Sequence, residues 1–126
     1  EELRQLDTSQ RLRDHSRAAL ATPDRSTGRR LFEAVTQGGA GAAGRQTGAL
    51  AVGNWADMLA LDTNNPDLEG MNGDLILDRY IFAGGDRMVC DVWSAGRHMV
   101  TQGRHIHRDD IEAAYRAAVR ALRATA

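Results

Sequence analysis

The sequence predicts a mixed α/β fold in which helices come first, β-hairpins follow, and one helix ends the chain. Three observations support this order. No glycine or proline occurs from Glu1 to about Thr22, short apolar runs separated by glycine and asparagine begin after Gly44, and residues 108–126 have an amphipathic helical pattern. These changes divide the chain into segments 1–46, 47–107 and 108–126.

The segment before Pro23 is expected to be a helix, because it carries acidic residues in its first turn and no helix breaker. Leu3, Leu6 and Leu20 could mark its buried stripe. Proline cannot continue a helix, so we expect this one to stop at Pro23.

A second helix should begin at Ser26 or Thr27, either of which can cap its first turn. We expect Gly38-Gly39 to end it, with residues 40–43 forming one further turn that Gly44 closes. Its apolar face consists of Leu31, Phe32 and Val35.

Two hairpins are expected in the middle segment. Residues 50–61 predict two strands around a tight turn at Gly53-Asn54. Residues 88–100 predict a second hairpin around Ala95-Gly96-Arg97, where glycine can adopt a positive φ, and residues 104–107 continue or close it.

Two short apolar runs between these hairpins leave their structure open. The spacing of residues 75–77 and 80–82 suits either a short helix or a strand, and periodicity does not separate the two. The large aromatic residues of this part of the chain are expected in the core, or next at an interface with another domain. They are Trp55, Tyr80, Phe82 and Trp93.

The final segment is predicted to be a helix with Asp109 as its candidate cap. Glu112 and Arg116 are four residues apart, so they can form an ion pair on its surface. The apolar stripe consists of Ile111, Tyr115, Ala118 and Leu122.

Composition excludes two classes of partner. A net charge of -1, with 26% charged residues of both signs, gives no one-sided field to attract nucleic acid or an anionic membrane. No apolar run reaches the roughly 20 residues needed to span a bilayer.

The lone Cys90 cannot form an internal disulfide, which favours a reducing, cytoplasmic setting. The first residues show neither an initiator Met nor a secretion signal, so we expect the chain to start inside a longer protein.

Histidines offer one candidate metal site. His105 and His107 alternate, so a strand would place both on one face, and His98 or Cys90 could complete a zinc donor set. No carboxylate is clearly placed to orient these imidazoles, so the pattern favours surface histidines.

Glycines and single nucleophiles offer weaker candidates. Residues 38–44 are glycine-rich but lack the preceding strand and the Lys-Ser/Thr ending of a phosphate loop, so helix termination and close packing explain them. Cys90 lies in an apolar run without an adjacent histidine, which favours a small buried side chain. Four aspartates at turns or strand edges are expected to be structural. They are Asp57, Asp62, Asp86 and Asp91. We therefore assign no catalytic, cofactor-binding or metal-ligating residue to this chain.

Two stretches resemble the C-terminal part of amidohydrolase-superfamily enzymes. Residues 48–62 fit the pattern G-x-L-x-V-G-x-x-A-D-x-x-x-L-D, and residues 92–105 are similar to the hairpin that follows it. In that superfamily these stretches belong to a small β-sandwich beside a metal-dependent (β/α)8 barrel. The resemblance thus implies that residues 47–107 are sandwich hairpins, that residues 1–46 are the last barrel helices, and that residues 108–126 are a C-terminal helix.

Within the superfamily, three further stretches resemble the formimidoylglutamate deiminase family. They are residues 1–13, residues 38–40 and residues 81–87. The resemblance implies a zinc enzyme that hydrolyses N-formimino-L-glutamate to N-formyl-L-glutamate and ammonia in histidine degradation. Its metal ligands and catalytic residues would precede Glu1, so we expect this chain alone to be inactive.

The resemblance also implies partners, namely the rest of the barrel, a small-molecule substrate and a second subunit in a homodimer. The chain departs from the family pattern at Gln5, Asp7, Thr8 and Cys90. Two alternatives remain open. The chain could belong to another amidohydrolase-superfamily deaminase, or it could be a non-catalytic interaction module that docks through a helix over residues 109–124.

Overall fold

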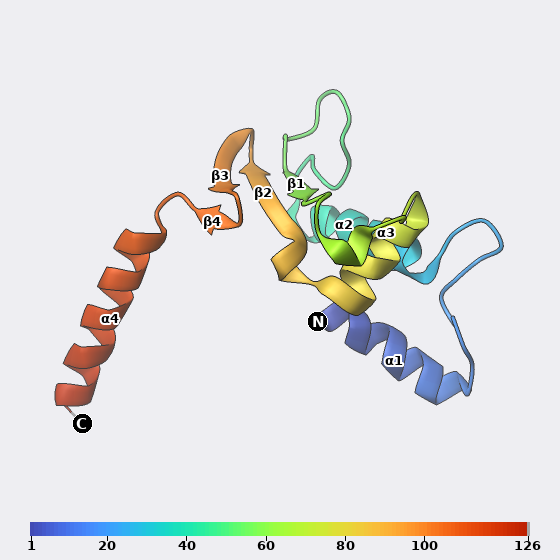
Figure 1. The fold of residues 1–126 in the computed structure, drawn as a ribbon, viewed down its shortest axis with the longest axis horizontal. Coiled ribbons are helices and arrows are strands. Elements are labelled where there is room, and N and C mark those ends of the chain that lie inside the picture. Colours follow the sequence, from blue (N-terminus) through green and yellow to red (C-terminus); the bar gives the residue numbers. More distant parts are fainter. Residues whose placement is uncertain (126) are drawn as a thin grey trace.

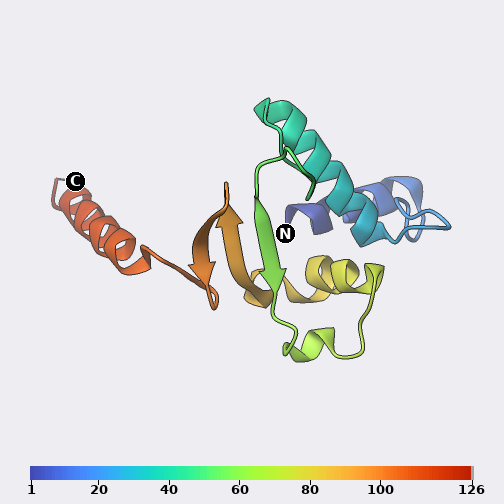
Figure 2. The same ribbon diagram turned by 90° about the horizontal axis from the view of Figure 1, so that it is seen from above.

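The computed structural model describes residues 1–125. Three helices gather beyond one edge of a four-stranded antiparallel sheet, and a fourth helix extends from the opposite edge (Figure 1). The strand order is β1-β2-β3-β4, so β1 faces the helical part and β4 leads to the projecting helix (Figure 2). Within residues 1–125, no helix is both long and apolar enough to cross a membrane.

Helix α1 (Glu2–Asp14) is shorter than expected. The prediction that it runs to Thr22 is wrong, because His15 adopts the left-handed conformation (φ 48°) and ends it. The backbone N–H groups of His15 and Ser16 both donate to the Arg11 carbonyl oxygen, which closes the last turn. Leu20 therefore lies in the following loop and is not part of a stripe on α1.

Helix α2 (Thr27–Ala43) begins as expected. The Ser26 side chain accepts from the Arg29 backbone N–H at 3.1 Å, which confirms Ser26 as the cap. The helix does not end at Gly38-Gly39, so that prediction is wrong. It continues to Gly44, whose positive φ (61°) supplies the left-handed C-cap that the earlier glycines do not adopt.

Residues 44–57 form a loop that leads into β1 (Met58–Leu61). The predicted hairpin of residues 50–61 is therefore wrong in its first strand. The loop is closed at its base by the Trp55 N–H, which donates to the Gln46 carbonyl oxygen at 2.7 Å. Leu50, which that strand would have contained, is 76% exposed in the loop.

Residues 75–77 and 80–82 are both helical, which settles the question that periodicity left open. A 3-10 turn, η1 (Pro66–Leu68), precedes α3 (Asp74–Arg79). A π-helical turn, η2 (Tyr80–Gly84), and a 3-10 turn, η3 (Asp86–Met88), then carry the chain back to the sheet.

The second hairpin is confirmed. Strands β2 (Val89–Ser94) and β3 (Arg97–Thr101) pair antiparallel, with Ser94 opposite Arg97. The turn residues Ala95 and Gly96 both have positive φ (50° and 77°), as a two-residue type I′ turn requires. A similar turn joins β3 to β4 (Arg104–His105).

The core lies between α2, η2 and η3. Its buried apolar side chains are Leu31, Ile81 and Met88, and Met88 is fully buried. The Arg4 Nε donates to the Ile81 carbonyl oxygen at 2.9 Å, which attaches α1 to this core. The prediction of an aromatic core is wrong, because each large ring is half-buried or exposed, and Trp55 is 46% exposed.

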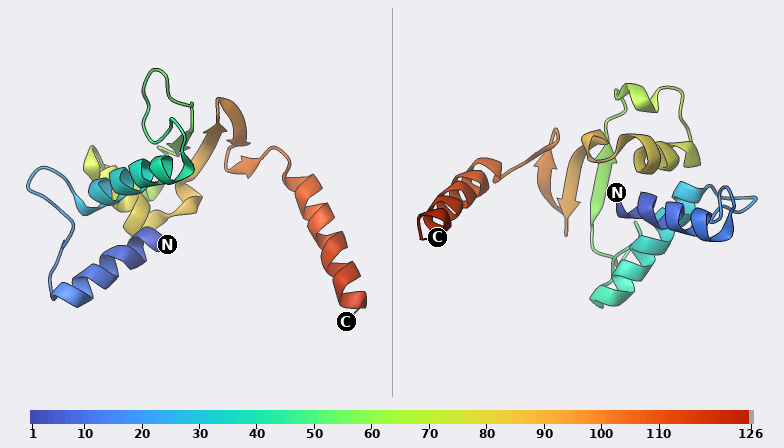
Figure 3. Two further views of the ribbon diagram at one scale, coloured as in Figure 1. Left: turned by 180° about the vertical axis from the view of Figure 1, so that it is seen from behind. Right: turned by 90° about the horizontal axis from the view of Figure 1, so that it is seen from below.

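Helix α4 (Arg108–Ala124) projects from the β4 edge into open space, as the views from behind and below also show (Figure 3). Asp109 is not its cap. The Asp109 carboxylate instead accepts from the Arg104 Nη2, at 2.5 and 2.6 Å. The expected Glu112–Arg116 ion pair is present at 3.7 Å, beside an Arg108–Glu112 pair at 2.8 Å.

Candidate functional site

The Asp57 carboxylate joins the loop before β1 to the turn between β2 and β3. Its Oδ1 accepts from the Ala95 backbone N–H at 2.7 Å, and its Oδ2 accepts from the Thr47 hydroxyl at 2.8 Å. These hydrogen bonds, the first above all, favour the ionised form and lower the pKa of Asp57. One oxygen holds the β2–β3 turn and the other holds the loop before β1, which supports the structural role expected for Asp57.

Asp91 and His98 face each other across the β2–β3 hairpin. The His98 Nε2 lies 2.8 Å from the Asp91 Oδ1, and its ring stacks on Trp93 with centroids 4.5 Å apart. Hydrogen bonds from Cys90 and then His98 lower the pKa of Asp91. The indole on one face of the imidazole and the carboxylate at its Nε2 hold His98 against β2 and stabilise the hairpin.

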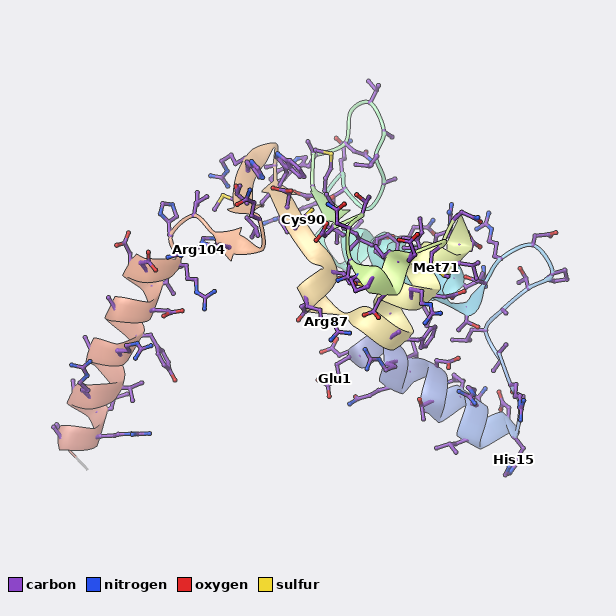
Figure 4. The ribbon with its side chains drawn as sticks, viewed as in Figure 1. Glu1, His15, Met71, Arg87, Cys90 and Arg104 are labelled. Atoms are coloured by element: carbon purple, nitrogen blue, oxygen red, sulfur yellow. The ribbon has the colours of Figure 1, made fainter. Side chains whose placement is uncertain are left out.

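Cys90 lies on β2 and is half-buried. A hydrogen bond to the Asp91 carboxylate, with burial second, raises the pKa of the Cys90 thiol. The Ala60 carbonyl oxygen, 3.4 Å from its Sγ, is a second acceptor. Nucleophilic catalysis needs a thiolate, so this environment disfavours it. Figure 4 places Cys90 on the sheet and His15 at the far end of α1.

The three histidines of the candidate zinc site do not converge. The rings of His105 and His107 are 5.8 Å apart and tilted, and the His105 Nδ1 accepts from the His107 backbone N–H. His98 is engaged on the hairpin with Asp91. Across residues 1–125, no group of three or more His, Cys, Asp or Glu side chains could hold a metal ion. The described residues therefore do not fit a zinc donor set.

The other two candidate aspartates, Asp62 and Asp86, lie in turns. The Asp62 Oδ1 accepts from the Asn64 backbone N–H at 2.9 Å, a side-chain turn that ends β1. Asp86 begins η3, and its charge adds to burial in raising the pKa of Tyr80. Neither carboxylate pairs with another acid or with a base in the part of the chain that the structure describes.

The glycine-rich segment forms the last turns of α2 and contains no phosphate loop. The prediction that these glycines allow close packing is wrong for Gly38, Gly39 and Gly41, because nothing lies within 4 Å of a Cβ added at any of them. Gly44 alone has the positive φ that ends the helix. These glycines are therefore not required by contacts within residues 1–125.

Sequence reasoning missed two acidic features near the helices. The first is a pair of α3 carboxylates at the amino end of α2, where Asp74 accepts from the Ser26 N–H at 3.1 Å and Asp78 accepts from the Gly28 N–H at 2.7 Å. Aspartates in the first and second turn of a short helix give no sequence signal for a partner so far away.

The second feature is Asp7, which is 5% exposed on the inner face of α1. Its Oδ1 has no hydrogen-bond partner among the described residues, and the Arg11 Nη1 lies 3.8 Å from its Oδ2. The sequence signal that could have predicted the burial of Asp7 is its position four residues after Leu3, on the same face of the helix.

Two open grooves also flank α1. They are lined by Glu1, Glu2, Leu3, Gln5 and Val35, and by Glu1, Arg4, Gln5, Thr8, Ser9 and Leu12.

Comparison with known proteins shows which kind of protein this chain resembles. No family model matches the chain. A formimidoylglutamate deiminase from Pseudomonas aeruginosa is 52% identical over 106 residues, which are 83% of this chain and 23% of that protein. The chain resembles the C-terminal portion of a formimidoylglutamate deiminase.

A solved structure agrees with this resemblance. The crystal structure of an amidohydrolase from Brucella melitensis is 44% identical and matches with a TM-score of 0.83, over 96% of this chain and 26% of that one. The resemblance predicted from the motifs is thus confirmed, as is the coarse α/β fold with a small antiparallel sheet. The chain spans about a quarter of the length of the formimidoylglutamate deiminase and of the amidohydrolase.

Proposed function

We propose that this chain is the C-terminal part of a zinc-dependent amidohydrolase that hydrolyses N-formimino-L-glutamate to N-formyl-L-glutamate and ammonia, in histidine degradation. The observation that carries the proposal is the 52% identity to a formimidoylglutamate deiminase across 83% of the chain. An identity of this size over most of a segment favours the same overall protein, and the activity would belong to that whole protein.

Within it, this chain would act as scaffold. Residues 1–46 would supply the last helices of a (β/α)8 barrel, residues 47–107 the hairpins of the β-sandwich, and residues 108–126 a C-terminal helix. Exposed large apolar side chains on the first two parts support this role, because burial of apolar surface against the rest of a larger protein is favourable. They include Leu6, Leu12, Val35, Leu50, Trp55 and Leu59.

Zinc would be held outside residues 1–125, since the described histidines and Cys90 do not form a donor set. When bound in an amidohydrolase, zinc supplies activation of a water molecule for attack on carbon. The role of the described residues is to stabilise the fold. Asp57 fixes the sheet to the preceding loop, and the α3 carboxylates fix α2 to α3.

The proposal extends to assembly and compartment. A homodimer of the whole protein follows from the family resemblance, and the lone Cys90 favours a reducing cytoplasm. The substrate specificity would be set by barrel loops outside this chain.

Ammonia release from N-formimino-L-glutamate tests the proposal. The intact protein containing this chain should release ammonia and contain zinc by elemental analysis, whereas the 126-residue chain alone should do neither. If the intact protein instead deaminates an amine on a ring compound and does not act on the formimino compound, the chain belongs to another amidohydrolase-superfamily deaminase. Hydrolysis by the 126-residue chain unaided would refute the scaffold role.

A further inference from the structure

Asn72 and Gly73 form the chain's one Asn-Gly dipeptide, in the loop between η1 and α3. This loop runs along the outside of the helical part (Figure 2), and Figure 4 labels the neighbouring Met71 there. Both residues of the dipeptide are exposed. Within residues 1–125, neither the Asn72 side-chain amide nor the Gly73 backbone N–H has a hydrogen-bond partner. A side-chain amide and a backbone nitrogen that no contact restrains are free to react with each other.

We propose that Asn72 is a site of spontaneous deamidation, where the chain modifies its own backbone with water as the sole co-reactant. The Gly73 backbone nitrogen gives up its proton to solvent and attacks the Asn72 Cγ, so that a C–N bond forms and closes a five-membered succinimide ring. The Cγ–Nδ2 bond breaks, and the amide nitrogen leaves as ammonia with a proton from solvent. Water then adds to either ring carbonyl and opens the ring to aspartate or to isoaspartate. The whole reaction consumes one water, releases one ammonia and replaces a neutral amide by a carboxylate.

Glycine after the asparagine makes this attack accessible. The side chain of any other residue would crowd the approach of its nitrogen to the Asn72 Cγ, and glycine has none. A Cβ built at Gly73 would meet no atom within 4 Å, so neighbouring segments leave the ring room to close. The positive φ of Gly73 (53°) explains why glycine stands here, since L side chains rarely adopt it. The backbone conformation that favours glycine just before α3 therefore also supplies the reactive nitrogen.

The other three asparagines lack such a nitrogen. The Trp55 N–H, which follows Asn54, donates to a carbonyl oxygen of its own loop at 2.7 Å. The Asn65 N–H, which follows Asn64, donates to a carbonyl oxygen at 3.1 Å. Pro66, which follows Asn65, has no N–H. The structure thus singles out the fourth asparagine, because the N–H that follows it donates to nothing in the described part of the chain.

The isoaspartate product changes the backbone where α3 is attached to α2. It adds a methylene to the main chain and moves the former Asn72 carbonyl, which accepts from the Leu75 N–H at 3.1 Å, into a side group. Two residues further on, the Asp74 carboxylate accepts from the Ser26 N–H at 3.1 Å, and the Arg29 Nη1 lies 3.6 Å from its Oδ1. Displacing the start of α3 therefore weakens these contacts and loosens the amino end of α2.

Mass spectrometry of the intact protein tests the proposal. Trypsin releases residues 46–79 as one peptide that holds all four asparagines, because no Arg or Lys precedes its last residue. After incubation in mildly alkaline buffer this peptide should gain about 1 Da, and electron-transfer fragmentation should show isoaspartate forming at position 72 at least about tenfold faster than at position 54. The rate should rise with pH, because the attacking nitrogen must lose a proton. Asn72→Gln should suppress the change, since glutamine would have to close a larger ring, and Asn64→Gln is the matched control that should keep it.

Two mass-spectrometric results would overturn the proposal, namely conversion at position 72 no faster than at position 54, and conversion that persists in Asn72→Gln. The loosening of α2 has its own measurement. Incubated protein should have a lower urea midpoint than fresh protein, whereas incubated Asn72→Gln and fresh Asn72→Asp should stay close to the fresh protein, because neither inserts the methylene. Equal midpoints for the incubated protein and Asn72→Asp would contradict the loosening. Neither measurement depends on deiminase activity, so a negative result contradicts this inference and leaves the proposed function standing.

Discussion

The backbone N–H of Gly28 donates to the Asp78 Oδ1 at 2.7 Å, so the amino end of α2 is capped by a side chain 50 residues further along the chain. The same approach leaves no room for a side chain at Gly28. A Cβ there would lie 2.5 Å from the Asp78 Oδ1 and 2.8 and 2.9 Å from the Asp78 backbone N and Cα.

Gly28→Ala should therefore lower the free energy of unfolding by about 1 to 3 kcal/mol, because backbone atoms of α3 must shift to admit the methyl group. Gly38→Ala is the control within the same helix, since a Cβ there meets nothing within 4 Å. It should raise stability by about 0.5 to 1 kcal/mol through helix propensity. Urea denaturation measures both. Equal effects of the two substitutions would show that the contact with α3 is not formed.

Met88 is the only large side chain that is fully buried among the described residues, so its removal should leave a cavity. Met88→Ala should destabilise the fold by about 2 to 5 kcal/mol. Leu12→Ala removes a similar volume from a 71% exposed position and should change stability by less than about 0.5 kcal/mol. Thermal unfolding followed by circular dichroism separates the two. A small effect at Met88 would place the core elsewhere.

Ala95 has a φ of 50°, which L-residues adopt at a cost of roughly 1 to 2 kcal/mol. Ala95→Gly should relieve this cost, partly offset by the greater freedom of glycine in the unfolded chain, and should stabilise the hairpin by about 0.5 kcal/mol. The same change at Ala34, in the exposed interior of α2, should cost about 1 kcal/mol. Opposite signs in urea denaturation are the expected result, and a loss at both sites would rule out the type I′ turn.

Stability should depend on pH through Asp57. Because hydrogen bonds from Ala95 and Thr47 lower its folded pKa, the carboxylate stabilises the fold at pH values above its unfolded pKa of about 3.9. That stabilisation is lost as the pH falls through the folded pKa. Asp57→Asn should therefore reduce the difference in urea midpoint between pH 7 and about pH 2.5. Asp24→Asn, at an exposed loop position, is the control and should leave the difference intact.

Local chemistry made part of the fold predictable. Ser26 before a helical run and glycine at the tip of a strand pair are signals that act within a few residues, and both structures formed as expected. The errors arose where local patterns were ambiguous. Gly38-Gly39 can end a helix or be tolerated inside one, and His15 ended α1 without any breaker residue.

Residues 50–52 have the apolar composition of a strand, but the structure gives them no strand partner among the described residues. A strand requires a neighbour for its backbone groups, and composition does not say whether one is present. The same reason limits the candidate site. Asp57 was expected at a turn or strand edge and His98 on the surface, and they lie there, whereas the same expectation for Asp91 is wrong because it lies within β2, opposite Ala60. No pattern in the sequence revealed Asp74 or Asp78 as partners of α2.

The pairing of α2 with α3 bears on how the molecule would respond to a protease. The loop of residues 44–57 is the exposed connection on which cleavage would concentrate. A single cut there would break the covalent link between α2 and α3, but Asp74 and Asp78 of α3 would still bind the amino end of α2. The nicked molecule should therefore migrate as one species in a native gel and as two only after denaturation.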